Sequence, residues 1–216
     1  MFPGNSGSGK VNGEGESNGE GNDADAILAD EIRALAAGGR TGDGVITVAT
    51  AESLTAGRVQ ALLGAASGAS AYFLGGVTAY TLAQKERLLG VPLAESEPCA
   101  GVSENVARLM AGGARRLFGA RVAVATTGFA EPAPESGVTA PFAWWAVAWS
   151  LQAEGAGGAG EAGGGGGEGS GLRFRTGRVE WPGVGRIVAQ TLTARAAAHA
   201  LRGVLRELRG NAAAVG

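Results

Sequence analysis

A serine stands where a predicted strand gives way to a predicted helix, and its position suits covalent chemistry. Residues 50–57 have the sequence TAESLTAG and follow a short apolar run over 44–50. The carboxyl ends of strands in open α/β sheets are where such proteins usually bind ligands. The free amides in the first turn of the following helix favour an anion or a developing oxyanion. Ser53 is therefore a candidate nucleophile, provided that a base takes its proton.

The same residue types also suit a purely structural role. Serine and threonine are favoured N-caps of helices, and a cap contributes about 1 kcal/mol. Ser53 or Thr55 could cap a helix over residues 54–63 without touching any substrate. The local pattern leaves both interpretations open.

The base could be a lysine or a carboxylate, and one lysine is well placed for the role. The single histidine, His199, lies in an Ala-rich helical stretch, and the other lysine lies in a polar N-terminal segment. Lys85 comes within a helical turn of a predicted strand over 72–80, so it could stand at the same edge of the sheet. To accept a proton near neutral pH, its pKa must fall from about 10.4, through burial or a nearby positive charge. The alternative is a solvated lysine beside Glu86 and Arg87.

A third strand brings further polar groups to this edge. Residues 121–127 predict a strand that is apolar from Val122 to Ala125, and Thr127 and Gly128 lie at its end. A hydroxyl and a glycine at a strand exit could line the crevice next to Ser53, because glycine lets the backbone approach a ligand closely. An ordinary strand exit would have the same residues.

The elements that position these residues alternate between strands and helices. Apolar periodicity predicts helices over 27–35, 54–63, 83–89, 104–118 (capped by Ser103) and 185–208, and strands over 44–50, 72–80, 121–127, 142–151 and 172–181. The last two strands are expected to pair antiparallel. Helices on both faces are the natural cover for so many apolar strands. We therefore predict a three-layer α/β/α sandwich with a mixed, largely parallel sheet.

Composition divides the chain into one domain and polar flanks. Of 216 residues, 40 are glycine, concentrated at the N-terminus and over 154–171. We predict a disordered Gly/Ser/Glu-rich tail over 1–25, one domain over 26–210 with a flexible insertion at 154–171 between two strands, and a flexible tail over 211–216. The single cysteine, Cys99, excludes an intramolecular disulfide and a cysteine-based zinc site.

Charge and hydropathy bear on the partners. The formal net charge is −2, and no apolar run reaches the length of a membrane span. We expect no nucleic-acid partner, no membrane partner and a cytoplasmic location. The N-terminus matches neither a secretory signal nor a transit peptide.

Four blocks of sequence carry a resemblance to a known family. They are residues 50–57 (TAESLTAG), 73–91 (FLGGVTAYTLAQKERLLGV), 101–107 (GVSENVA) and 124–132 (VATTGFAEP). In this order they resemble the CinA C-terminal domain family, whose members include nicotinamide-nucleotide amidohydrolases. The resemblance extends over about residues 27–208, with the glycine tract as an insertion.

The resemblance implies deamidation of nicotinamide mononucleotide to nicotinate mononucleotide and ammonia, without metal or cofactor. By the family pattern, Ser53 is the nucleophile, Lys85 supports it and Tyr80 belongs to the catalytic group. We expect the substrate to contact the residues Glu52, Thr55, Gly57, Thr127 and Gly128. The partner implied is a small nucleotide, and a homodimer is possible for the family.

Departures from the family pattern fall near the expected nucleotide. Leu54 replaces a cysteine, Ala56 a glycine, Leu82 an asparagine and Glu131 a glycine, and a family lysine before the fourth strand is absent. Glu131 places a carboxylate where a phosphate would approach. Two alternatives therefore remain: a non-catalytic binding or oligomerisation module, and an amidase for a different, uncharged substrate.

Overall fold

The computed structural model describes residues 17–38, 44–150 and 171–213. Within them the strands are β1 (Val48–Glu52), β2 (Phe73–Thr78), β3 (Val122–Phe129), β4 (Phe142–Ser150) and β5 (Leu172–Glu180). The helices are α1 (Ser17–Ala37), α2 (Arg58–Gly64), α3 (Leu82–Leu89), α4 (Leu93–Ser96), α5 (Glu104–Phe118) and α6 (Arg186–Ala213).

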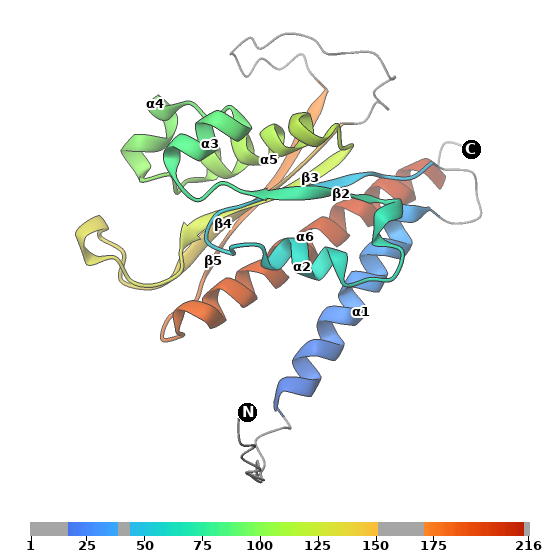
Figure 1. Ribbon diagram of the computed structural model, residues 1–216, viewed down its shortest axis with the longest axis horizontal. Coiled ribbons are helices and arrows are strands. Elements are labelled where there is room, and N and C mark those ends of the chain that lie inside the picture. The colour runs from blue at the N-terminus through green and yellow to red at the C-terminus, as the bar shows by residue number, and fades with distance from the viewer. Residues whose placement is uncertain (1–16, 39–43, 151–170, 214–216) are drawn as a thin grey trace, which may run out of the picture.

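The strands form one mixed sheet in the order β2-β1-β3-β4-β5. Strand β1 pairs parallel with both β2 and β3, whereas β4 is antiparallel to β3 and to β5. Helices cover both faces: α3, α4 and α5 lie on one side, and α1, α2 and α6 on the other (Figure 1). The predicted α/β/α sandwich with a mixed sheet is confirmed, as is the antiparallel pairing of the last two strands.

Valine and alanine alternate along the central strands, and this alternation separates two cores. Val48, Val122, Val124 and Val147 face the core under α1, α2 and α6, whereas Ala49, Ala123, Ala146 and their alanine neighbours face α5. Side chains of successive strand residues point to opposite faces, so the pattern gives the sheet one bulky face and one flat face. The flat face lets α5 lie close to the strands.

The tryptophans of β4 follow the same alternation. Trp145 and Trp149 pack against the core under α6, and Trp144 packs against the core under α5. Neighbouring Trp144 and Trp145 therefore face opposite layers of the sandwich.

Several predicted helix ends agree with the structure, and some need correction. Helix α5 spans the predicted residues, and the Ser103 hydroxyl accepts a hydrogen bond from the Val106 amide as a cap. Helix α1 already begins at Ser17, so the expected disorder is wrong for residues 17–25. Helix α6 continues to Ala213, which corrects the expected tail over 211–213. The remainder of both tails, and residues 154–170 of the glycine tract, lie outside the described residues.

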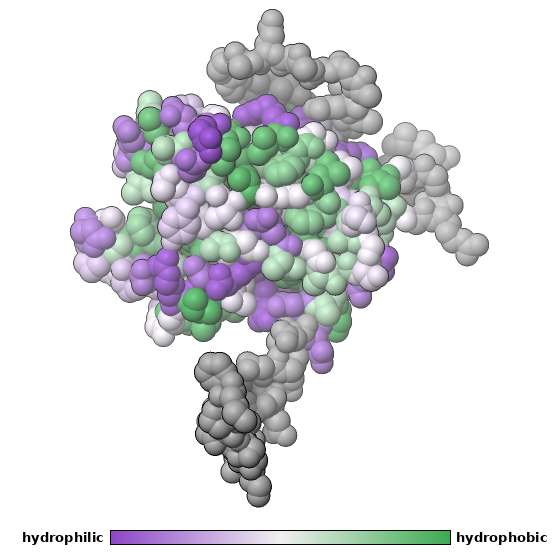
Figure 2. Space-filling model, viewed as in Figure 1, coloured by the Kyte–Doolittle hydropathy of each residue, from purple (hydrophilic) through white to green (hydrophobic). Residues whose placement is uncertain are grey.

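The surface on the side of strand β2 mixes hydrophilic and hydrophobic residues (Figure 2). Leu74 of β2 and Leu117 of α5 are among the exposed large apolar side chains. Among the described helices, none is long and apolar enough to cross a membrane.

Candidate active site

The carboxyl ends of the three parallel-paired strands meet at one edge of the sheet. Ser53 follows β1 directly, Lys85 lies on α3 just after β2, and Thr127 and Gly128 lie near the end of β3. All four line a cavity of about 310 Å³, together with Tyr80 and other residues. Cavities of this size suit small molecules. The structure thus brings together Ser53, Lys85 and residues 127–128, which their positions after predicted strands made candidates for this edge.

The Lys85 ammonium and the Ser53 hydroxyl are in direct contact. Lys85 Nζ lies 2.9 Å from Ser53 Oγ, and both residues are buried, with 3% and 7% of their surface exposed. Nζ also donates to the carbonyl oxygens of Ala79 at 3.1 Å and Tyr80 at 3.3 Å. Burial lowers the pKa of Lys85 to about 8, because the charged form loses its hydration. A usable fraction of the amine is then neutral near physiological pH.

The local structure around helix α3 positions the Lys85 side chain next to Ser53. Helix α3 begins after Thr81, whose hydroxyl accepts a hydrogen bond from the Gln84 amide, and Lys85 follows in the first turn. Its aliphatic stem packs against Gly101, which has φ +73°. A Cβ atom at Gly101 would lie 2.7 Å from Leu82 Cδ2 and 3.6 Å from Lys85 Cε. A side chain at this position would therefore clash with Leu82 on the same helix, whereas its contact with Lys85 would be an ordinary van der Waals contact.

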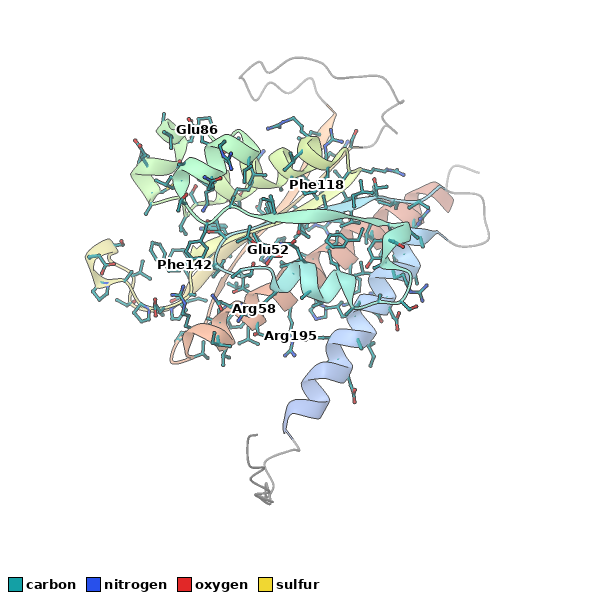
Figure 3. All side chains as sticks on the ribbon, in the orientation of Figure 1. Glu52, Arg58, Glu86, Phe118, Phe142 and Arg195 are labelled. Atoms are coloured by element: carbon teal, nitrogen blue, oxygen red, sulfur yellow. The ribbon has the colours of Figure 1, made fainter. Side chains whose placement is uncertain are left out.

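The Glu52 carboxylate occupies the N-terminus of helix α2. Its oxygens accept hydrogen bonds from the amides of Gly57 at 2.9 Å, Val59 at 3.1 Å and Gln60 at 2.8 Å. The helix begins at Arg58, later than the predicted residue 54. Two expectations are therefore wrong: the cap is neither Ser53 nor Thr55, and these helix amides are not free for an oxyanion. Figure 3 labels Glu52 between β1 and α2.

Glu52, Thr55 and Gly57 do not line the cavity. The fully buried Thr55 hydroxyl donates to Glu52 Oε2 at 2.6 Å and lies 2.7 Å from the Thr126 hydroxyl. Ala56 and Gly57 both have positive φ, +51° and +93°. In place of the expected substrate contacts, the structure gives these residues the role of fixing the tight turn that presents Ser53.

Thr127 and Gly128 line the cavity, and each also has a structural partner. The Thr127 hydroxyl donates to the Gly101 carbonyl at 2.6 Å, which ties β3 to the loop before α5. A Cβ atom on Gly128 would lie 2.3 Å from the carbonyl oxygen of Phe142, on strand β4. Glycine is therefore required here because strand β4 approaches closely, and not, as expected, because a ligand does.

The mouth of the cavity contains an arginine that the sequence did not single out. Arg186, at the start of α6, donates one hydrogen bond to the Tyr80 hydroxyl at 2.7 Å and another to the Glu131 carboxylate. All three side chains line the cavity and are partly exposed. The sequence signal for Arg186 was only its place at the start of a long helix. Within the described residues, no cluster of histidine, cysteine and carboxylate side chains is suited to hold a metal ion.

Comparison with known proteins gives one consistent result. The sequence profile of the CinA C-terminal domain matches residues 35–155. A CinA-like protein of Mycolicibacterium vanbaalenii is 48% identical over 107 residues, which are 50% of this chain and 24% of that protein. The chain thus spans about a quarter of the length of that curated relative.

Solved structures agree with this assignment. The competence damage-inducible protein A of Klebsiella pneumoniae superposes with a TM-score of 0.67 at 27% identity, covering 84% of this chain and 97% of that one. A second CinA superfamily protein from Klebsiella pneumoniae gives a TM-score of 0.67 at 26% identity, covering 85% and 98%. With the profile match over residues 35–155, the chain belongs to the CinA C-terminal domain family.

Proposed function

We propose that this protein is a serine amidohydrolase that deamidates nicotinamide mononucleotide to nicotinate mononucleotide and ammonia. The observation that carries the proposal is the buried contact of 2.9 Å between Ser53 Oγ and Lys85 Nζ at the base of a ligand-sized cavity. A nucleophile and a base within hydrogen-bond reach are the signature of nucleophilic catalysis. The substrate follows from the family resemblance.

The first half of the reaction makes an acyl-enzyme. Neutral Lys85 takes the proton of the Ser53 hydroxyl while Oγ bonds to the carboxamide carbon, and the carbonyl oxygen becomes negative. The new ammonium of Lys85 lies beside this oxygen and offsets its charge. Lys85 then gives the proton to the departing nitrogen, the carbon–nitrogen bond breaks and ammonia leaves.

The second half returns the enzyme to its starting state. Water loses a proton to Lys85 and adds its oxygen to the ester carbon, and the Ser53 oxygen leaves with the proton that Lys85 returns. The carbonyl oxygens of Ala79 and Tyr80 hold the lysine in place through both halves. Tyr80 contributes through this backbone contact, and its hydroxyl stands at the cavity mouth with Arg186.

The test is ammonia release from nicotinamide mononucleotide by the purified full chain. Ser53→Ala and Lys85→Ala should each reduce release to the background rate. Arg87→Met is the matched control, because Arg87 lies on the same helix, is exposed and donates its side-chain hydrogen bonds to Gln84, away from the cavity. Release that is no faster with the parent than with Ser53→Ala would exclude this function and favour the non-catalytic module.

A further inference from the structure

Arg186 and Glu131 form an ion pair at the mouth of the cavity. Arg186 comes from the start of α6 and Glu131 from the segment after β3, and they meet although they are far apart in sequence. Both side chains line the cavity that contains Ser53 and Lys85. They are partly exposed, 41% for Arg186 and 59% for Glu131, so neither is locked in the core.

Arg186 has the character of an anion-binding group. One terminal nitrogen contacts Glu131 and the other donates to the Tyr80 hydroxyl, which orients the guanidinium plane at the rim. A guanidinium matches the geometry of phosphate and carboxylate oxygens. Its anionic partner in the structure is the chain's own Glu131.

We propose that Arg186 receives the anionic group of the substrate, and that Glu131 competes with this group for the guanidinium. Glu131 is then a specificity-determining residue that sets how well the site takes a phosphate-bearing amide relative to the same amide without phosphate. The proposal rests on the proposed function for placing the carboxamide at Ser53, but it concerns binding at the other end of the cavity.

The exposure of the pair limits how strongly Glu131 competes. Exposed ion pairs contribute little net stabilisation because solvent screens them, so a phosphate dianion can displace the carboxylate into water. Removing the competitor should strengthen phosphate binding about fivefold, which corresponds to about 1 kcal/mol. Removing Arg186 should weaken the same binding at least about tenfold, because the phosphate then meets the uncompensated Glu131 carboxylate.

The test is calorimetric titration of the full chain with Ser53→Ala, which prevents turnover, using nicotinamide mononucleotide and nicotinamide riboside. These ligands share the carboxamide and the ring and differ by the phosphate. Glu131→Gln should raise the affinity for the mononucleotide about fivefold, Arg186→Gln should lower it, and neither should change riboside binding. The matched controls are Arg175→Gln and Glu207→Gln, since this pair is similarly exposed, at 37% and 53%, and does not line the cavity.

The outcomes separate this proposal from the proposed function. If the two substitutions shift mononucleotide binding in opposite directions but the parent releases no ammonia, the proposed function fails and the assignment of Glu131 and Arg186 stands. If Arg186→Gln weakens both ligands alike, or Glu131→Gln leaves mononucleotide binding unchanged, the assignment is overturned. Absence of mononucleotide binding both before and after Glu131→Gln also overturns it.

Discussion

Raising the pH from 6 to 9 should increase the reactivity of the Ser53 hydroxyl, because only the neutral form of Lys85 can take its proton. Burial lowers the pKa of Lys85 to about 8. With this value, the neutral fraction is about 1% at pH 6, about 10% at pH 7 and about 90% at pH 9. The rate of attack by Ser53 should therefore rise about tenfold per pH unit at the acid end and level off above about pH 9.

The assay does not depend on the identity of the substrate. The full chain is treated with phenylmethanesulfonyl fluoride, which reacts with activated serines, and the adduct at Ser53 is quantified by mass spectrometry at a series of pH values. Ser53→Ala gives the blank. Lys85→Met, which keeps the length of the side chain without its amine, should slow labelling throughout and remove the rise near pH 8. Arg87→Met should keep the parent's profile.

Two results would refute the reasoning. The labelling rate could be the same at pH 6 and pH 9, in which case Ser53 is not activated by a group that titrates near neutral pH. Alternatively, the rise could persist in Lys85→Met, which would assign the base to another group. Either result would leave the 2.9 Å contact as a structural hydrogen bond only.

Three further predictions concern stability. The pKa of Lys85 is lower in the folded chain than in the unfolded one, so Lys85 lowers the free energy of unfolding; this loss is complete below about pH 8 and disappears as the pH rises toward 10.5. At pH 7, Lys85→Met should therefore have a free energy of unfolding, measured by chemical denaturation, up to about 3 kcal/mol above the parent's, and it should lose this advantage near pH 10.5. Ala56→Gly should stabilise the fold by about 1 kcal/mol and raise Tm by about 2–4 °C, because Ala56 has φ +51°; an unchanged or lower Tm would contradict this. Glu52→Gln should lower the free energy of unfolding by about 2–3 kcal/mol and slow Ser53 labelling, because one carboxylate oxygen that accepts from the α2 amides is replaced by an NH₂ group that faces those N–H donors. A stability equal to the parent's in chemical denaturation would contradict this prediction.

Local sequence signals were sufficient for much of the fold. Ser103 followed by an apolar periodicity predicted helix α5 with its cap, and the periodicity over residues 83–89 predicted the end of α3. The sequence placed Ser53 after one predicted strand and Lys85 within a helical turn of another, and the family resemblance paired the two residues; the structure shows that these strands, β1 and β2, are parallel neighbours. These features depend on contacts within a few residues or on the sheet's connectivity.

Features that depend on distant contacts were not accessible from sequence. Glu52 was expected to contact the substrate, and only the folded turn shows its carboxylate directed at the α2 amides. The pairing of Arg186 with Glu131 joins segments whose relation is set by how α6 crosses the sheet. The early part of α1 looked too polar to fold, yet Asp25 forms two hydrogen bonds, at 2.7 and 3.0 Å, with Arg195 of α6.

The antiparallel register of β4 and β5 separates the two ends of the sheet. Phe142 pairs with Glu180 beside the edge that carries Ser53, whereas Ser150 pairs with Leu172 at the opposite end, and the glycine tract joins those two residues. Changes in the length of this connection therefore act on the side of the domain away from Ser53. Insertions and deletions between Ser150 and Leu172 should therefore have little effect on the site at Ser53. The same connection is suitable for inserting an affinity tag or a fluorescent reporter.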